Sequence, residues 1–348
     1  MSRSSGRLRT KKSRSSARTA SREFDFERIA SELVRSVRGD ASRARLSRRG
    51  GYRSNSVSRW EAGTAFPTAS RFLSLLKTLA PGRPAYVERF FTRPPAVFDA
   101  LDPTSPAGVA AFLRELRGRT PILAIARDSG FNRYSVSRWL KGQAEPRLPE
   151  FLCLVETLSR RLLDFIACVG EPRRVASVVR AWDRLELARS LAYDMPWSHA
   201  VLRALELDSG ERQHQKAWLA ERLGIGVAEV SVALRALVAS GQVKRSGGRY
   251  GIERILNVDT SRDRTRAHAL KIAWTRTALE RMQAGAPGAY GYTLFAVSRA
   301  DLRRLRELHL EYVRAMQYLI SESSPGECVG LYCAELMDLA ATDNVFGA

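Results

Sequence analysis

Apolar residues recur at three- and four-residue spacing through much of the first half of the chain. Phe26, Ile29, Leu33 and Val37 fall on one helical face, and Gly39 follows them. This periodicity predicts an amphipathic helix that ends at the glycine. Several more short apolar-periodic segments follow, separated by glycine and proline residues that end helices. The pattern therefore predicts a mainly α fold made of short helices.

The same pattern occurs twice. Residues 33–79 align with residues 112–158 at a constant offset of 79, without a gap, and 18 of the 47 aligned positions are identical. The identities include Trp60 with Trp139, so the similarity does not come from low complexity. Two copies indicate a duplication, because a solenoid needs three or more repeats for its stability. We expect each copy to fold into the same small helical bundle.

A motif within the first copy indicates what the bundle is. Gly51 stands at a turn between two short helices, Val57 and Trp60 mark the inner face of the second helix, and Gly63 ends it. In this spacing the copy resembles the helix-turn-helix of phage-repressor-type regulators, which include the lambda and Cro-like repressors. The resemblance covers about 65 residues per copy. It implies that each copy is a helix-turn-helix module that binds double-stranded DNA, and that the chain carries two such modules in tandem.

The second copy departs from the family motif at one position. The motif has a glutamate there, as does the first copy at Glu61, whereas the second copy has Leu140. A reading helix, the helix that enters the major groove, buries one stripe and presents the other to the bases. The residues expected to face DNA from the first copy are Arg43, Arg48, Arg49, Arg53, Ser54, Asn55, Ser58 and Arg59, and those from the second copy are Arg133, Tyr134, Ser137 and Arg138. Because Ile122 stands where the first copy has Arg43, we expect the first copy to be the better reader.

The pattern changes from residue 193 onward. Helices are predicted over 197–205, 216–223 and 227–240, and two short strands flank a turn at residues 246–248. Three helices followed by a hairpin are the layout of a winged helix. The start of its third helix is apolar or acidic, which suits a DNA groove poorly, so a protein-interaction module is the favoured role. Lys244, Arg245 and Arg249 of the hairpin favour DNA contact.

The remainder of the chain predicts a small α-β-α-β module. Long helices are expected over about 263–284 and 299–322, each followed by a strand, at 292–297 and 327–336. Residues 197–340 resemble the C-terminal region of an uncharacterised bacterial family, in which a winged helix precedes such a module. The resemblance lies in the segments WSH, LAERLGI and GYTLFAVSRADLRRLREL. It implies a bacterial regulator and teaches nothing of mechanism.

These patterns divide the chain into seven segments. They are a basic arm (1–22), a first helix-turn-helix domain (23–91), a linker (92–106), a second helix-turn-helix domain (107–170), a connecting helix (171–192), the winged helix (193–258) and the α-β-α-β module (259–348). The arm carries eight Arg or Lys residues and no acid. It cannot bury enough apolar surface to offset its ordering entropy, so we expect it to be disordered.

Charge narrows the class of partner. The net charge is +21, and residues 1–60 hold 17 basic against 5 acidic residues. A surplus of this size implies a polyanionic partner, with nucleic acid ahead of a membrane surface. No apolar run reaches the length of a membrane span. The four cysteines predict reduced core thiols of a cytosolic protein rather than a disulfide scaffold.

These observations predict a sequence-specific transcription regulator that binds double-stranded DNA in the bacterial nucleoid. The two copies would form a pseudo-dimer within one chain, on successive major grooves about 34 Å apart, and would read two unlike half-sites. The C-terminal half would serve homodimerisation or effector sensing. We expect no cofactor, metal or enzymatic activity, since no phosphate-loop, GxSxG or HExxH motif is present. Two alternatives are a non-specific nucleoid or DNA-bridging protein and an enzyme whose site lies in the C-terminal module.

Overall fold

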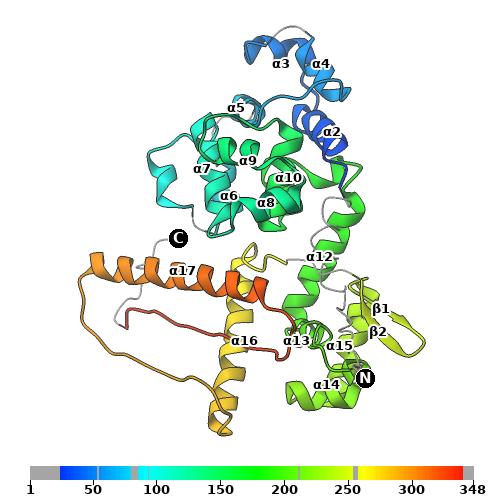
Figure 1. Ribbon diagram of the computed structural model, residues 1–348, viewed down its shortest axis with the longest axis vertical. Coiled ribbons are helices and arrows are strands. Elements are labelled where there is room, and N and C mark those ends of the chain that lie inside the picture. Colours follow the sequence, from blue (N-terminus) through cyan, green and yellow to red (C-terminus); the bar gives the residue numbers. More distant parts are fainter. Residues whose placement is uncertain are drawn as a thin grey trace, which may run out of the picture. The chain divides into compact units, whose positions relative to one another are not determined.

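The computed structural model describes residues 24–52, 55–79, 85–92, 94–210, 212–253 and 258–339 (Figure 1). The chain divides into two compact units, Met1–Asp183 and Arg184–Ala348. The described residues form sixteen α-helices, three 3-10 helices and a single two-stranded sheet. The fold is therefore mainly α, which confirms the prediction from apolar periodicity. The expected basic arm, residues 1–22, lies outside the described residues.

Five helices form the first copy. They are α2 (Phe26–Arg38), α3 (Arg43–Arg49), α4 (Ser56–Glu61), α5 (Ala69–Leu79) and α6 (Tyr86–Phe90). The side chain of Asp25 caps α2 by accepting a hydrogen bond from the Arg28 amide, at 3.0 Å. Ser42 caps α3 in the same way through the Arg45 amide, at 3.1 Å. Such caps satisfy amide groups that have no partner within the helix.

Five helices with the same order form the second copy. They are α7 (Pro106–Arg117), α8 (Ile122–Ser129), α9 (Arg133–Leu140), α10 (Leu148–Ser159) and α11 (Leu162–Val169). The backbone repeats at the offset of 79 residues: Gly51 and Gly130 have φ angles of 65° and 77°, and Gly63 and Gly142 both have 71°. Glycine adopts these positive angles without the steric cost that other residues meet. The duplication seen in the sequence is thus also a duplication of conformation.

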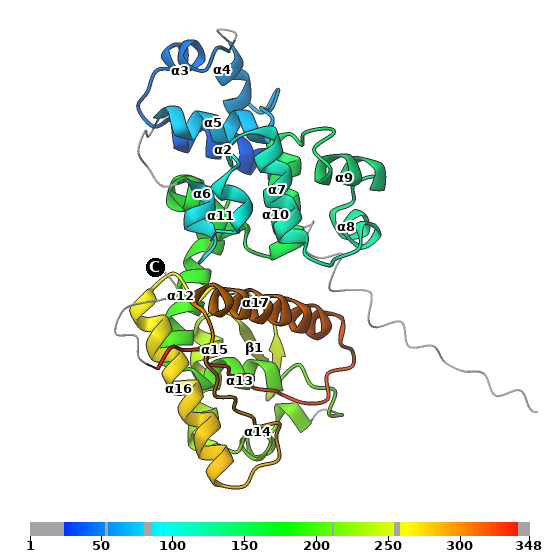
Figure 2. The ribbon, with the colours of Figure 1, turned by 90° about the vertical axis from the view of Figure 1, so that its left-hand side faces the viewer.

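Aromatic side chains from both copies form the centre of this unit. Phe90 of the first copy and Phe112, Phe151 and Phe165 of the second are almost fully buried. Phe112 lies with its ring centroid 5.3 Å from that of Phe90 and 6.0 Å from that of Phe165. Because one core includes residues of both copies, the copies fold as one body. In Figure 2 the α3–α4 and α8–α9 pairs lie at different ends of this body, with α2, α5, α7 and α10 between them.

Short elements connect the copies to each other and to the second unit. A 3-10 helix, Ala96–Asp99, lies between α6 and α7, and another, Pro172–Arg174, follows α11. Helix α12 (Val179–Asp194) then contains the division between the two units, which falls after Asp183.

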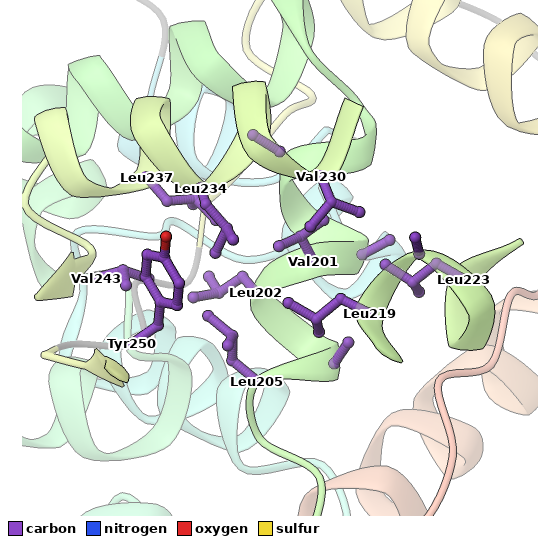
Figure 3. Close-up of a cluster of buried hydrophobic side chains, with 14 residues drawn as sticks. Val201, Leu202, Leu205, Leu219, Leu223, Val230, Leu234, Leu237, Val243 and Tyr250 are labelled. Atoms are coloured by element: carbon purple, nitrogen blue, oxygen red, sulfur yellow. The ribbon is translucent and has the colours of Figure 1, made fainter. Parts of the chain in front are cut away.

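After α12, the second unit continues with three α-helices, one 3-10 helix and a hairpin. They are α13 (Trp197–Ala204), the 3-10 helix Arg212–His214, α14 (Lys216–Leu223), α15 (Val227–Ala239), β1 (Val243–Ser246) and β2 (Arg249–Ile252). The strands pair antiparallel, and Gly247 and Gly248 form the turn with φ angles of 57° and 80°. Positive φ at both turn positions suits the twist of a two-residue hairpin. Apolar side chains of these helices and strands, including Val201, Leu234 and Tyr250, interlock as one core (Figure 3).

Two long helices, α16 (Arg264–Gln283) and α17 (Arg299–Glu322), follow. Their bounds agree with the prediction to within one residue at each end. The two strands predicted after them, at 292–297 and 327–336, are wrong: both segments lie in irregular chain, outside any sheet of the described residues. The apolar residues there favour strands, but a strand also needs a neighbouring strand, and within the described part of the chain neither segment pairs with one. The α-β-α-β architecture is therefore not formed.

The cysteines divide between the two units. Cys153 and Cys168 are buried as predicted, whereas Cys328 is exposed and Cys333 is partly exposed. Burial raises the pKa of the Cys153 thiol to about 11. The prediction of a core thiol is wrong for Cys328 because it belongs to the irregular C-terminal segment. Among the described helices, none combines the length and the apolarity that a membrane span requires.

Candidate nucleic-acid interface

The inner face of α4 is fixed by two side chains, Val57 and Trp60. Val57 is fully buried and Trp60 is 5% exposed. The Trp60 ring packs edge-on against Tyr52, with centroids 4.9 Å apart. Both positions were predicted to be core, and the structure confirms it. Burial of this stripe determines which side chains of α4 remain available to a ligand.

The opposite face of α4 is polar and exposed. Ser58 and Arg59 lie on the helix, Asn55 precedes its first residue, and all three are exposed. The Arg59 carbonyl accepts a hydrogen bond from the Thr64 amide at 3.1 Å, which holds the chain after the helix against it. Three predicted DNA contacts are thus brought together on one short helix.

The remaining predicted contacts of the first copy lie on or next to α3. Arg48 is exposed, and Arg49 belongs to α3, though its side chain lies outside the described part. Arg53 and Ser54 lie outside the described residues altogether. Arg43 begins α3 and is half exposed, but its Nε donates a hydrogen bond to Glu61 Oε2 at 2.6 Å. Arg43 was predicted to contact DNA, and it has a partner in its own domain as well.

Glu61 is the centre of that ion-pair cluster. Its side chain is 2% exposed and accepts hydrogen bonds from both Arg38 and Arg43. Burial raises the pKa of Glu61, but the hydrogen bonds from Arg38 and Arg43 and their charges lower it by more. The pKa of Glu61 therefore lies below its ordinary value. A buried carboxylate in this position is ionised and holds α2, α3 and α4 together. The motif signalled Glu61, but its partners lie 18 and 23 residues away in the sequence.

In the second copy, α9 has the same inner stripe. Val136 is fully buried and Trp139 is 8% exposed. The Trp139 ring packs edge-on against Phe131, with centroids 5.3 Å apart. Asn132 caps the helix by accepting a hydrogen bond from the Tyr134 amide at 2.8 Å. A side-chain cap of this kind is absent from α4.

The predicted contacts of the second copy lie on the outer face of α9. Arg133, Tyr134 and Arg138 are exposed, and Ser137 is partly exposed. The Arg133 guanidinium donates to the Tyr134 hydroxyl at 2.8 Å and lies 4.7 Å from the ring centroid. These two side chains lie against each other and form one polar and aromatic surface at the beginning of α9. Such a surface suits stacking as well as hydrogen bonding.

The charge next to the two candidate reading helices differs. Helix α3 has the sequence RARLSRR, with four arginines and no acid, whereas α8 has ILAIARDS. Its single basic residue, Arg127, pairs with Asp128 at 2.8 Å, so α8 carries no net charge. The surface beside α4 is therefore far more cationic than the surface beside α9.

The hairpin of the second unit carries the other predicted contacts. Lys244 and Arg245 lie on β1 and Arg249 lies on β2, and all three are exposed. The Arg245 guanidinium lies 5.8 Å from the Tyr250 ring centroid. Across the described residues, no group of three or more His, Cys, Asp or Glu side chains is placed to hold a metal ion.

Comparison with known proteins gives a family match that lies mostly in the second unit. No curated protein and no solved structure gives a match to the chain. Residues 180–335 match the model of a domain of unknown function, DUF4423.

Proposed function

We propose that this protein is a sequence-specific double-stranded DNA-binding transcription regulator. One observation carries the proposal: two short helices, α4 and α9, each bury a Val and a Trp and expose an arginine on the opposite face, in a chain of net charge +21. Arg59 and Arg138 stand at the same position of these two helices. A guanidinium at that position can bind the O6 and N7 atoms of guanine in the major groove.

The proposal includes the finer architecture. We propose that α3–α4 and α8–α9 are helix-turn-helix units, and that α13–α15 with the hairpin form a winged helix. The wing residues Lys244, Arg245 and Arg249 then add phosphate contacts, since exposed basic side chains without base partners bind the DNA backbone. The N-terminal arm adds sequence-independent affinity in the same way.

A randomised-site selection tests the proposal. The wild-type protein is expected to recover a defined motif from random duplexes. Arg59→Ala and Arg138→Ala should each relax base preference at one position of one half-site and weaken binding to that half-site by about 1–3 kcal/mol. Arg173→Ala is the matched control, because Arg173 is an exposed arginine outside both copies that pairs with Asp183. It should leave the motif unchanged.

The charge of the chain favours one rival, a non-specific nucleoid or DNA-bridging protein. Such a protein binds through phosphates alone, so its affinity is equal on all duplexes and falls steeply with salt. Recovery of no motif by the wild type would establish this rival. Uniform weakening by Arg59→Ala on every duplex would assign Arg59 to the backbone and remove it from the base readers.

We also propose that the C-terminal half forms a homodimer. Large apolar side chains are unusually exposed there: Tyr292 is 90%, Leu294 78% and Leu319 71% exposed, and α16 has no buried residue. Exposed apolar surface of this extent marks interaction sites in soluble proteins. Sedimentation should show a dimer for the wild type and a monomer for the double variant Leu294→Asp/Leu319→Asp. A monomeric wild type at micromolar concentration would contradict this part of the proposal.

A further inference from the structure

The two copies exchange a matched pair of backbone hydrogen bonds. The Ala69 amide donates to the Pro146 carbonyl at 3.0 Å, and the Leu148 amide donates to the Pro67 carbonyl at 2.9 Å. Positions 67 and 146, and 69 and 148, differ by the repeat offset of 79. Exchanging the copies therefore converts the first bond into the second.

Two further contacts join a residue to its own counterpart. Thr68 pairs with Arg147 as an antiparallel bridge, and the rings of Tyr86 and Phe165 have centroids 5.8 Å apart. Both pairs are again separated by 79 positions. A residue can contact its own counterpart across the boundary only when it lies close to an axis that exchanges the copies. The two pairs mark two places along that axis.

A reciprocal packing contact completes the pattern. Gly170 lies against Leu33, so closely that an added Cβ atom would be 3.3 Å from Leu33 Cδ1. At the counterpart positions, Phe91 and Phe112 pack with ring centroids 5.6 Å apart. Residue i of one copy thus contacts residue j of the other, and the counterpart of j contacts the counterpart of i. This reciprocity defines an isologous, two-fold interface, as opposed to a head-to-tail one.

We infer that the two candidate reading helices, α4 and α9, are related by a pseudo-two-fold axis within one chain, and that the DNA one chain binds is an inverted repeat with two unlike arms. The inference rests on the proposed function and adds the orientation of the half-sites. A duplex has local two-fold symmetry, so two helices related by a two-fold axis meet the same sequence on opposite strands. A head-to-tail arrangement of the same helices would select a direct repeat. The arm centres should be about 10–10.5 base pairs apart, or one further turn of the helix.

The arms differ because the exposed residues of the two helices differ. Ser58 and Arg59 are repeated as Ser137 and Arg138, so base preferences set by these residues should recur in both arms. At the two sequence positions before Ser56 and Ser135, the first copy has Ser54 and Asn55, and the second has Arg133 and Tyr134, which begin α9. The arms should therefore diverge at the base pairs nearest the start of each helix.

A double substitution makes the two copies alike at these positions. Arg133→Ser/Tyr134→Asn gives α9 the same sequence as the first copy through the tryptophan, SNSVSRW. Both replaced side chains are exposed and bond to each other, and Asn132 caps the helix through the backbone amide of position 134. The substitution therefore leaves the core and the helix cap in place. Circular dichroism confirms folding before the DNA experiments.

Site selection with the full-length wild type and this variant tests the inference. The wild type should recover an imperfect inverted repeat, and the variant should recover one whose arms have become alike. On synthetic duplexes, changing the arm spacing by 5 base pairs should weaken binding at least about tenfold, because the arms then lie on opposite sides of the helix.

Each contrary result has a distinct meaning. A direct repeat recovered by the variant overturns the two-fold inference and leaves the proposed function standing. A perfect palindrome recovered by the wild type also overturns it, since each arm would then be read by the same copy of two chains. Recovery of no motif by the wild type removes the proposed function, and the inference with it.

Discussion

The two copies of the N-terminal unit share hydrogen bonds to backbone carbonyls and differ in a bond between side chains. Arg35 donates to the carbonyl of Glu61 at 3.0 Å, and its counterpart Arg114 donates to the carbonyl of Leu140 at 2.9 Å. The same bond thus persists although the side chain at the acceptor position has changed from a carboxylate to an isobutyl group. A bond to a carbonyl oxygen does not depend on the side chain of the accepting residue.

The position of Glu61 and Leu140 shows what happens when a side chain is itself the partner. Glu61 binds Arg38 and Arg43, whereas the corresponding positions of the second copy are Leu140, Arg117 and Ile122. Arg117 keeps only a backbone partner, the Thr120 carbonyl at 2.9 Å, which matches the bond from Arg38 to the Ala41 carbonyl at 2.8 Å. The second copy thus lacks the carboxylate and the cation at the position of Arg43, and it keeps the arginine at the position of Arg38.

The largest expected effect tests the likeness of the two buried faces. Trp60→Ala and Trp139→Ala should each destabilise the unit by about 3–5 kcal/mol, because each removes a large buried ring and its edge-on aromatic contact. Urea denaturation followed by far-ultraviolet circular dichroism measures both. Losses that differ by more than about 2 kcal/mol would show that the copies are not equivalent in their cores.

A smaller effect is expected where the copies differ. Glu61→Gln removes the acceptor charge of two arginine hydrogen bonds and should cost about 1–3 kcal/mol of folding free energy. The partial exposure of Arg38 and Arg43 limits the loss, since water can solvate them. Leu140→Met, at the matched position, should cost less than about 1.5 kcal/mol. A loss below about 0.5 kcal/mol for Glu61→Gln would mean that the ion-pair cluster contributes nothing measurable to stability.

The same cluster predicts a pH dependence. The pKa of Glu61 is lower in the folded state than its ordinary value of 4.5, so the unfolded chain takes up the proton first as the pH falls. The stability that Glu61 adds is therefore fully present above pH 4.5 and is lost as the pH falls through the folded-state pKa. The difference in unfolding free energy between wild type and Glu61→Gln should shrink over that window. A difference that stays constant from pH 7 to pH 3 contradicts the assignment.

Removing the side chain of the residue before the helix should cost about 1 kcal/mol more folding stability in the second copy than in the first. Asn132→Ala removes the side chain that caps α9 and should lower stability by that amount. Asn55 makes no such bond, so Asn55→Ala should change stability by less than about 0.5 kcal/mol. Thermal or urea unfolding distinguishes the two. A loss at Asn55 as large as that at Asn132 would assign it a structural role in place of a role in DNA binding.

The smallest effect concerns charge. Arg48 and Arg127 are counterparts, but Arg48 belongs to a cluster of arginines and Arg127 pairs with Asp128. Arg48→Ala should reduce the slope of log affinity against log salt by about 0.9, the share of one phosphate contact. Arg127→Ala should leave the slope unchanged. Titration of a labelled duplex at several salt concentrations measures both, and a change for Arg127→Ala alone would reverse the proposed order of the copies.

Patterns within a few residues of each other predicted the structure best. The stripe formed by Val57 and Trp60, the two-residue turn at Gly247 and Gly248, and the bounds of α16 and α17 all follow from periodicity and turn chemistry that operate locally. Their energetics depend on neighbours that the sequence places nearby.

Features that depend on a distant partner were missed. The strands expected at 292–297 and 327–336 have apolar residues that favour a sheet, yet a sheet also requires a partner strand, which no local pattern specifies. The pairing of Arg43 with Glu61 and the bonds between residues 67–69 and 146–148 likewise join segments that are remote in sequence. Both copies have a proline at this position, Pro67 and Pro146. The alignment of the two copies did not indicate that these prolines lie at a contact between them.

The backbone hydrogen bonds between residues 67–69 and 146–148 have a consequence for how this protein evolves. In a homodimer, one gene encodes both halves, so every substitution appears on both sides of the axis. Here each half has its own codons, and the bonds between residues 67–69 and 146–148 join amide and carbonyl groups that nearly any residue supplies. Either half can therefore acquire new exposed side chains without disturbing these bonds. The replacement of Ser54 and Asn55 by Arg133 and Tyr134 beside an unchanged SVSRW segment is the kind of divergence that this arrangement permits.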